Sequence, residues 1–225
     1  MCKVSAIIPT LWKAKNFINH LVHVLISDES VGEIIIIDND PTDFFYDNEK
    51  VITLKQKENL YVNPSWNLGI EECIYDRFIF FNDDIIIPYN FVSKLHDSIT
   101  EEIGLIGLDE KSIIKDKKFD DERISILNRD IQLKPTISRN WGFGMIMAGH
   151  VKSYHKIPEN LRIWYGDDFL FKTNNRLGKT NYVIDDIPIF TKASATSDLE
   201  DFNEIKNIDT LMYDTFNTDR KENNG

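Results

Sequence analysis

Along the first half of the chain, unbroken runs of apolar residues take turns with segments whose apolar residues recur at helical spacing. Runs without a two-residue alternation are typical of strands buried on both faces and occur at 4–8, 33–37 and 78–81, with a further short strand predicted at 51–54. Apolar positions at helical spacing predict helices at 16–26, 63–75 and 91–99. Strands that alternate with helices predict an α/β fold with a mostly parallel central sheet and flanking helices.

The pattern changes after a strand predicted at 103–108. Residues 109–130 are rich in Lys and Asp, which predicts an exposed excursion, and buried structure returns with the small and aromatic residues of 141–148. A helix with an acidic first turn is predicted near 164–171, and a last strand at 182–190.

A C-terminal helix is predicted from a final set of apolar residues at helical spacing. These residues are Leu199, Phe202, Ile205, Ile208 and Leu211 or Met212. We expect this helix to dock one face on the domain and to be followed by frayed residues from about Thr218.

Adjacent carboxylates follow the most apolar of the strands. Phe78–Phe81 leads directly into Asn82, Asp83 and Asp84. Ligands of open α/β sheets bind where the carboxyl ends of the strands emerge, and oxygen ligands at that place suit Mg²⁺ or Mn²⁺ holding the phosphates of a substrate. The alternative is a solvated turn, because Asn and Asp are common in turns.

Two more acidic pairs strengthen the first interpretation. Asp38 and Asp40 follow the strand at 33–37, and Asp167 and Asp168 stand at the start of a predicted helix. In a parallel sheet the pairs after the two strands face the same edge. Carboxylates that converge on one cleft favour a catalytic site over separate solvated turns.

Bulk composition excludes several classes of protein. With 42% hydrophobic and 28% charged residues the 225-residue chain has an ordinary globular composition. A formal charge of −11 and a pI near 4.9 argue against nucleic acid or an anionic membrane as the partner. Cys2 and Cys73 form neither a disulfide framework nor a zinc-ligand spacing, and no apolar run approaches the roughly 18 residues of a membrane span. We expect a cytoplasmic protein.

The order of these segments resembles the inverting glycosyltransferases of family 2, which have the GT-A fold. The resemblance covers roughly 4–190. It rests on Ile8-Pro9-Thr10, on the Asp-rich turn of 34–43, on the Asn-Leu segment of 59–70, on Asn82-Asp83-Asp84 in place of the Asp-x-Asp motif, and on Gly166-Asp167-Asp168 in place of the Glu-Asp pair. Two departures are Tyr61, where glycine is usual, and Thr191, where many relatives have a metal-binding histidine.

The resemblance implies a GT-A fold with a Rossmann-like sheet in one domain, 1–197. About 1–108 would bind the nucleotide and 109–197 the acceptor, with a C-terminal helix and tail in 198–225. The implied enzyme is an inverting, metal-dependent glycosyltransferase of the hexosyltransferase type. It would move a sugar from a nucleotide-diphosphate donor, preferably a UDP-sugar, to a hydroxyl acceptor such as a growing glycan.

On the donor side, the resemblance implies that Asp84 binds Mn²⁺ or Mg²⁺, which would stabilise the departing diphosphate. Asn82 and Asp83 assist through the ribose, water or the metal's outer shell. Asp38 would bind the edge of the nucleobase. The other residues expected to bind the nucleotide are Pro9, Thr10, Asp40 and Asn67. Alternatively, Asp38 or Asp40 caps its own turn, and Asn67 braces a loop.

On the acceptor side, the resemblance implies that Asp168 is the general base, with Asp167 beside it in the catalytic pair. An inverting displacement needs a carboxylate within reach of the acceptor hydroxyl, opposite the leaving group. Asp167 would bind the acceptor or cap the helix. Trp141 and Trp164 flank the expected acceptor cleft and offer aromatic faces to a sugar, although a large aromatic residue is more often part of the core.

Two other functions remain open. A sugar nucleotidyltransferase would also have an α/β domain with metal-binding carboxylates, but it usually has a Gly-rich phosphate loop near the first strand, and residues 11–15 contain no glycine. A noncatalytic nucleotide- or carbohydrate-binding module derived from a transferase would explain Asn82 and Thr191, whereas intact Asp84 and Asp168 speak against it.

Overall fold

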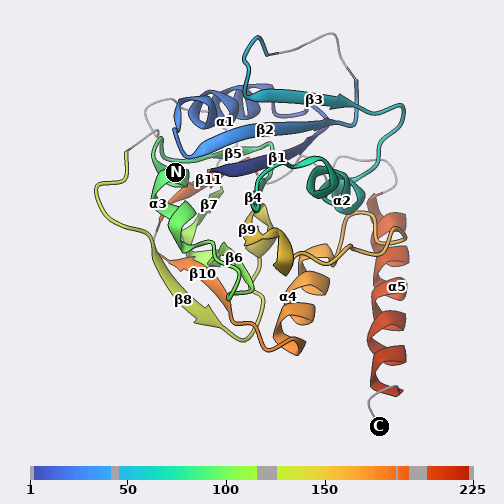
Figure 1. The fold of residues 1–225 in the computed structure, drawn as a ribbon. Coiled ribbons are helices and arrows are strands. Elements are labelled where there is room, and N and C mark those ends of the chain that lie inside the picture. The colour runs from blue at the N-terminus through green and yellow to red at the C-terminus, as the bar shows by residue number, and fades with distance from the viewer. Residues whose placement is uncertain (1–2, 42–45, 116–125, 186, 193–201, 223–225) are drawn as a thin grey trace.

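The computed structural model describes residues 3–41, 46–115, 126–185, 187–192 and 202–222. These residues form an eight-stranded main sheet in the order β3-β2-β1-β4-β9-β6-β10-β8 (Figure 1). Its strands are β1 Val4–Thr10, β2 Val31–Asp38, β3 Val51–Lys55, β4 Arg77–Phe81, β6 Leu105–Leu108, β8 Gln132–Thr136, β9 Ile146–His150 and β10 Asn181–Asp185. All run in one direction except β9 and β8, which are antiparallel to their neighbours. The predicted α/β fold with a mostly parallel sheet is confirmed.

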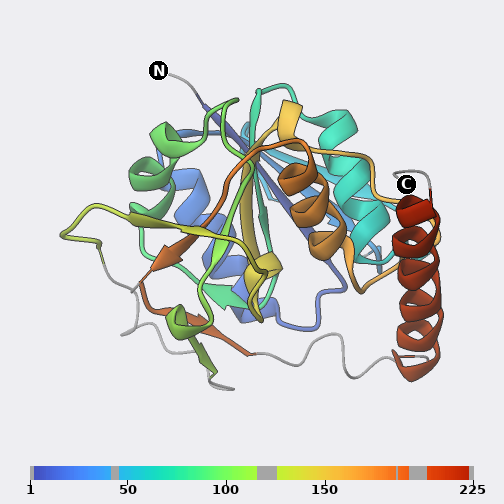
Figure 2. The ribbon, with the colours of Figure 1, turned by 90° about the horizontal axis from the view of Figure 1, so that it is seen from below.

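Helices cover both faces of this sheet (Figures 1 and 2). One face carries α1 Lys15–Ser27 and α3 Phe91–Leu95, and the other carries α2 Val62–Glu72 and α4 Gly166–Arg176. The long helix α5 Phe202–Glu222 stands outermost, on the side of α2 and α4. Short 3₁₀ turns occur as η1 His96–Ser98, η2 Glu110–Ser112, η4 Phe143–Met145 and η5 Val151–Ser153.

Strand β2 shows why its sequence has no alternation. Ile34 and Ile36 are fully buried in the core with α1, whereas Ile35 and Ile37 are fully buried in the core with α2 and α4. Because both faces of the strand are covered, both sets of side chains must be apolar. Burial of each such side chain stabilises the fold by about 2 kcal/mol.

A second, three-stranded sheet corrects two predictions. It consists of β5 Ile85–Ile86, β11 Ile189–Thr191 and β7 Ile113–Lys115, with β11 in the middle. The single strand predicted at 182–190 is wrong, because β10 and β11 belong to different sheets. The exposed excursion predicted at 109–130 is also wrong in part. Within it, β7 is a strand and Leu127 is buried, while 116–125 lie outside the described residues.

Helix α5 is present as predicted, and Ile205 docks as expected, but the docked face turns away from Ile208 and Leu211. Ile208 and Leu211 are 38% and 64% exposed, whereas Ile205, Asp209 and Tyr213 are buried. Leu199 and the terminal residues 223–225 lie outside the described part of the chain, and the helix continues past Thr218 to Glu222. The apolar spacing located the docked face only in part, because the buried residue at its centre is charged and not apolar.

That residue, Asp209, binds the loop that leads into α4. Its carboxylate is fully buried and accepts three backbone hydrogen bonds, from the amides of Arg162 (3.0 Å), Ile163 (2.8 Å) and Trp164 (2.8 Å). Tyr165 of the same loop stacks on Tyr213 of α5, with ring centroids 4.7 Å apart. Three donors on one carboxylate satisfy its buried charge, so α5 fixes the entry of α4.

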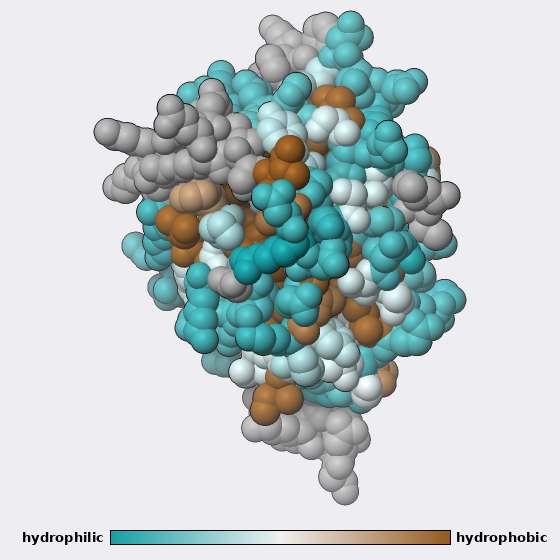
Figure 3. All heavy atoms as spheres, turned by 90° about the vertical axis from the view of Figure 1, so that its left-hand side faces the viewer, coloured by the Kyte–Doolittle hydropathy of each residue, from teal (hydrophilic) through white to brown (hydrophobic). Residues whose placement is uncertain are grey.

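Hydrophilic side chains cover most of the face seen in Figure 3, and hydrophobic ones form small groups among them. Of the helices in the described residues, none is long and apolar enough to cross a membrane.

We predict that Asp209→Ala lowers the free energy of unfolding by about 3 kcal/mol. The change leaves three backbone amides without their charged acceptor in a buried place. Urea unfolding measures the effect. Asp214→Ala, an exposed carboxylate on the same helix, is the matched control and should change stability by less than about 0.5 kcal/mol. Equal stability of the two variants would contradict the role of Asp209.

Candidate active site

The carboxyl edge of the main sheet brings Asp38, Thr10 and Asp83 together. Thr10 and Asp38 are register partners at the ends of β1 and β2. The hydroxyl of Thr10 donates to Asp83 Oδ2 at 2.6 Å and accepts the backbone N–H of Trp12 at 2.8 Å. The Trp12 indole in turn donates to Asp38 Oδ1 at 2.7 Å. The two acidic turns, expected to face one edge, are therefore joined by a continuous chain of hydrogen bonds.

Asp38 and Asp40 differ in their surroundings. Asp38 is fully buried, and its Oδ1 also accepts the backbone N–H of Asp40 at 3.3 Å, as in an Asx turn. The turn-capping alternative thus describes one of its contacts. Asp40 is exposed at the rim, with Lys13 Nζ 3.9 Å from its carboxylate. Pro9 lies beside Thr10 in β1, paired with Ile37.

Asp83 is nearly buried, at 9% exposure. Burial raises the pKa of its carboxyl group to about 6, with a smaller contribution from the neighbouring charge of Asp84, while the hydrogen bond from Thr10 opposes the shift. A buried carboxylate pair held close to the edge of the sheet is destabilising by itself. Buried carboxyl groups with a raised pKa are found preferentially at functional sites.

Asp84 begins the connection to the small sheet. It is 5% exposed, and its carbonyl oxygen accepts the backbone N–H of Lys192 at 3.0 Å. Thr191, the residue before Lys192, is fully buried and pairs with Ile85, the residue after Asp84. Thr191 therefore lies next to the acidic turn, at the place where the sequence comparison expected a histidine.

The turn η4 connects the first acidic cluster to the second. Its Met145 carbonyl accepts the backbone N–H of Asn82 at 2.9 Å. One residue earlier, Gly144 lies against Asp167, so close that a Cβ on this glycine would stand 2.9 Å from Asp167 Oδ2. Asn82, the residue before Asp83, and Asp167 are far apart in sequence, yet both contact this short turn.

Asp167 and Asp168 occupy the first turn of α4, where the helix dipole favours negative charge. Asp167 Oδ1 accepts the backbone N–H of Asp168 at 3.0 Å, within the first turn, while the N-cap position itself is Tyr165 and has no side-chain cap bond. Burial and the charge of Asp168 raise the pKa of Asp167, and the Arg139 guanidinium works against them. Arg139 Nε is 2.7 Å from Asp168 Oδ2 and 3.5 Å from Asp167 Oδ2. The sequence analysis missed Arg139.

The two tryptophans expected at the acceptor cleft have different environments. Trp141 is 47% exposed, two residues after Arg139, with Lys115 Nζ 4.0 Å from its ring centroid. Trp164 instead faces α5, packed edge-on against Phe202 at 5.2 Å and beneath Lys206. Trp141 offers an accessible ring, whereas the ring of Trp164 is occupied by the C-terminal helix.

Asn67 lies outside the acidic cluster. Its side chain donates to the carbonyl of Ile157 and accepts both the Ile157 N–H and the Tyr154 hydroxyl. These bonds favour the bracing alternative. A bracing role also describes Asn39, which the sequence analysis did not single out. It is buried beside Asp38, accepts the N–H of Leu60 and donates to Ser65.

Strained backbone gathers around the same edge. Among the described residues other than glycine, positive φ occurs at Trp12 (57°), Tyr61 (66°) and Tyr165 (64°), each just before a helix that flanks the main sheet. Tyr61 thus keeps the kind of backbone that glycine would adopt at this place. Such conformations cost about 1–3 kcal/mol each and occur preferentially at functional sites.

Solved structures with the same architecture are glycosyltransferases. S. aureus TarS is 15% identical, with a TM-score of 0.60 over 90% of this chain and 63% of its own. GalNAc-T7 with UDP, GalNAc and Mn²⁺ is 12% identical, with a TM-score of 0.59 over 84% and 43%. The mannosyltransferase PcManGT from Pyrobaculum calidifontis, with GDP-Man and Mn²⁺, is 10% identical, with a TM-score of 0.59 over 86% and 57%.

The chain has the GT-A fold. At these identities the likeness establishes the fold alone. The chain spans less than two thirds of the length of each of these structures. No protein-family model and no curated protein matches it significantly.

Within the GT-A fold, the residues at Asp83 and Asp84 fit a shared metal site. No group of three or more His, Cys, Asp or Glu side chains comes together as a metal cage in the part of the chain that the structure describes. Mg²⁺ and Mn²⁺ bound to nucleotides, however, are often held by one or two carboxylates together with phosphate oxygens. Two adjacent buried carboxylates supply that set, and a cation would relieve the cost of their burial.

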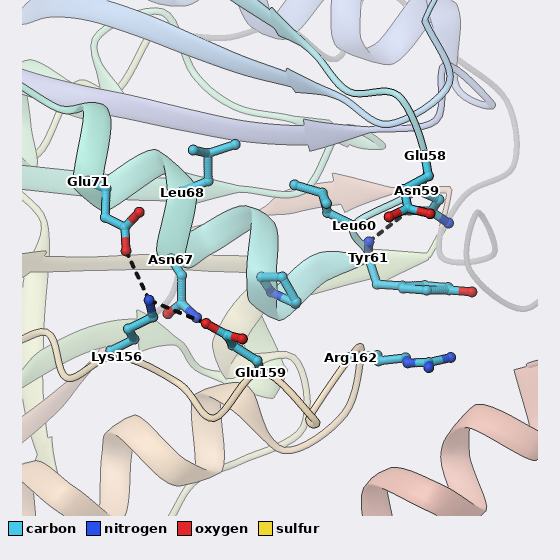
Figure 4. A pocket seen from close by; sticks show the side chains of 11 residues that line it. Glu58, Asn59, Leu60, Tyr61, Asn67, Leu68, Glu71, Lys156, Glu159 and Arg162 are labelled. Atoms are coloured by element: carbon cyan, nitrogen blue, oxygen red, sulfur yellow. Dashed lines mark hydrogen bonds and ion pairs between the residues drawn. The ribbon is translucent and has the colours of Figure 1, made fainter.

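A separate groove of about 630 Å³ lies on the outer side of α2 (Figure 4). Tyr61 and Arg162 stand at one end, and Lys156 at the other forms ion pairs with Glu71 and Glu159. Asn67 is the one predicted site residue that lines it. The groove is therefore distinct from the acidic cluster.

We predict that Asp83→Asn stabilises the protein above pH 6 by about 3 kcal/mol. The folded-state pKa lies about two units above the ordinary value, so ionisation of Asp83 opposes folding as the pH rises through this range. The gain should vanish below about pH 4, where the carboxyl group is protonated in both states. Unfolding by urea between pH 4 and 8 measures it, with exposed Asp40→Asn as the control. A gain that does not depend on pH would contradict the prediction.

Proposed function

We propose that this protein is an inverting, metal-dependent glycosyltransferase that moves a sugar from a UDP-sugar to a hydroxyl acceptor, with a glycan as the favoured acceptor. The observation that carries the proposal is the arrangement around η4. The turn that carries Asp83 and Asp84 contacts η4 through the backbone of Asn82, and Asp167, the neighbour of Asp168, contacts η4 at Gly144. A transferase needs this division, because one cluster must hold the leaving diphosphate and the other must activate the acceptor.

The donor half of the site is the carboxyl edge of β1, β2 and β4. Here Asp38 and Thr10 would hold the nucleoside, with Asp40 at the rim towards the ribose. Asp84, assisted by Asp83 and Asn82, would bind Mn²⁺ or Mg²⁺. When bound, the metal supplies positive charge to the departing diphosphate. The UDP- or UDP-sugar-bound structures of TarS and GalNAc-T7, and the Mn²⁺ of GalNAc-T7 and PcManGT, support this choice.

The acceptor half is the first turn of α4 with the loop that carries Trp141. Asp168 would accept the proton of the acceptor hydroxyl as that oxygen attacks the anomeric carbon and the bond to the diphosphate breaks. Attack from the side opposite the leaving group inverts the anomeric centre. Asp167 accepts the backbone N–H of Asp168, which suits a role in positioning its neighbour. Trp141 is placed to offer its ring to the acceptor.

A thermal-shift screen of nucleotide-sugars with and without Mn²⁺ tests the donor class, since a bound ligand raises the apparent stability. We expect UDP-sugars with Mn²⁺ to stabilise the protein more than GDP-sugars or either component alone. Stabilisation by UDP-sugars with no turnover would favour the noncatalytic binding module instead.

We predict that Asp84→Ala weakens the binding of UDP in the presence of Mn²⁺ by at least about 10-fold while the fold is retained. The substitution removes one of few protein oxygens available to the metal. Titration calorimetry measures the affinity, circular dichroism checks the fold, and exposed Asp97→Ala is the control. Unchanged affinity in a folded variant would remove Asp84 from the metal site.

We predict that Asp168→Asn slows transfer by at least about 100-fold, the usual scale of general-base catalysis, with UDP affinity near that of the wild type. Asparagine keeps the size of the side chain but accepts no proton. Proton NMR of the wild-type product from an α-linked donor should show a β linkage. An α-linked product, or full activity of the variant, would refute the assignment.

A further inference from the structure

Arg139 is a cation that pairs with the proposed base. It lies between β8 and η4, in the same loop as Trp141. Its Nε approaches Asp168 Oδ2 at 2.7 Å and Asp167 Oδ2 at 3.5 Å, and its NH1 donates to the carbonyl of Asn140 at 3.0 Å, which fixes the direction of the side chain. The guanidinium is thus anchored to its own loop and directed at both carboxylates.

The pairing takes place largely out of water. The side chains of Arg139, Asp167 and Asp168 are 26%, 16% and 20% exposed. Burial alone would lower the pKa of Arg139, but contact with Asp168 and the charges of Asp167 and Asp168 raise it overall. Tyr213 of α5 is the other titratable group that acts on the guanidinium. One cation therefore serves two adjacent carboxylates in an environment that screens charge poorly.

Two neighbouring carboxylates without a cation do not both stay ionised easily, because each raises the pKa of the other. A protonated Asp168 accepts no proton from an acceptor. The ion pair at Oδ2 also restrains the position of the Asp168 carboxylate. Both consequences depend on a residue that no sequence motif marks.

We propose that Arg139 is a positioning residue that holds Asp168 in place as the base and supplies the positive charge for the acidic pair. The inference rests on the proposed function, and it assigns a role in that site to the loop between β8 and η4. An arginine that contributed packing alone would affect stability alike at every pH. If the charge of Arg139 serves the acidic pair, its removal causes a loss of stability that grows as the pH rises. The loss of turnover, in contrast, shrinks as the pH rises.

The first experiment needs no substrate. It compares thermal unfolding of the wild type, Arg139→Ala and Arg176→Ala between pH 4.5 and 7.5. Arg176 is exposed at the far end of α4 and matches the loss of charge. Burial raises the pKa of Asp167 and the charge of Arg139 opposes that rise, so removal of Arg139 raises the pKa of Asp167 further. Stability from a raised carboxyl pKa is lost as the pH rises. We expect the deficit of Arg139→Ala to widen towards pH 7.5 and that of Arg176→Ala to stay constant. Parallel curves for Arg139→Ala and the wild type would overturn the proposal.

The second experiment measures turnover as UDP release, with Mn²⁺, from a mixture of UDP-glucose, UDP-galactose, UDP-GlcNAc and UDP-GalNAc. Water serves as the acceptor. We expect the acidic limb of the pH–rate profile to move up by about one unit or more in Arg139→Ala. At a pH on that limb turnover would fall by about 10-fold, and it would recover at higher pH, with UDP affinity unchanged. Arg139→Lys should restore most of the profile.

The two experiments separate two kinds of failure. An acidic limb that does not move in Arg139→Ala overturns the role of Arg139. No UDP release from the wild type overturns the proposed function and the assignment of a base with it, while the unfolding curves still show whether the cation governs the acidic pair.

Discussion

The desolvation of negative charge is the constraint on which the arrangement of this protein depends. The chain has a formal charge of −11, yet Asp38, Asp83, Asp84 and Asp209 are buried. Several of these carboxylates are matched by donors from distant segments: the Trp12 indole for Asp38, the Thr10 hydroxyl for Asp83 and three backbone amides for Asp209. The main sheet, the α4 loop and α5 are held in place partly by these matches, because a buried carboxylate without donors is strongly destabilising.

The parts of the fold that rest on local patterns could be predicted from the sequence. The unbroken run in β2 reports burial on both faces, and helical spacing locates α1, α2 and α4. Asp38 and Asp83 could be placed at one edge because parallel strands end together. The GT-A fold was likewise recognisable from the order of short motifs.

What the sequence could not predict depends on contacts between distant segments. Arg139 is one arginine in an irregular loop, and its significance comes from Asp168 on another element. Asp209 was overlooked because a polar residue in the middle of a helix is ordinarily assigned to the exposed face, so the predicted docked face included Ile208 and Leu211 beside Ile205. The division of 182–190 between two sheets is similarly invisible, since both pieces are apolar and buried.

Asp209 holds the loop before α4 in a way that leaves the sequence of this loop free to diverge. Its carboxylate contacts backbone amides and no side chain of Arg162, Ile163 or Trp164. A clamp of this kind is indifferent to the identity of the residues it holds, apart from proline, which lacks the N–H group. The shape of the loop and the identity of its side chains are therefore decoupled. Related chains could change the chemistry of this surface by substitution while the start of α4, with its acidic pair, stays where it is.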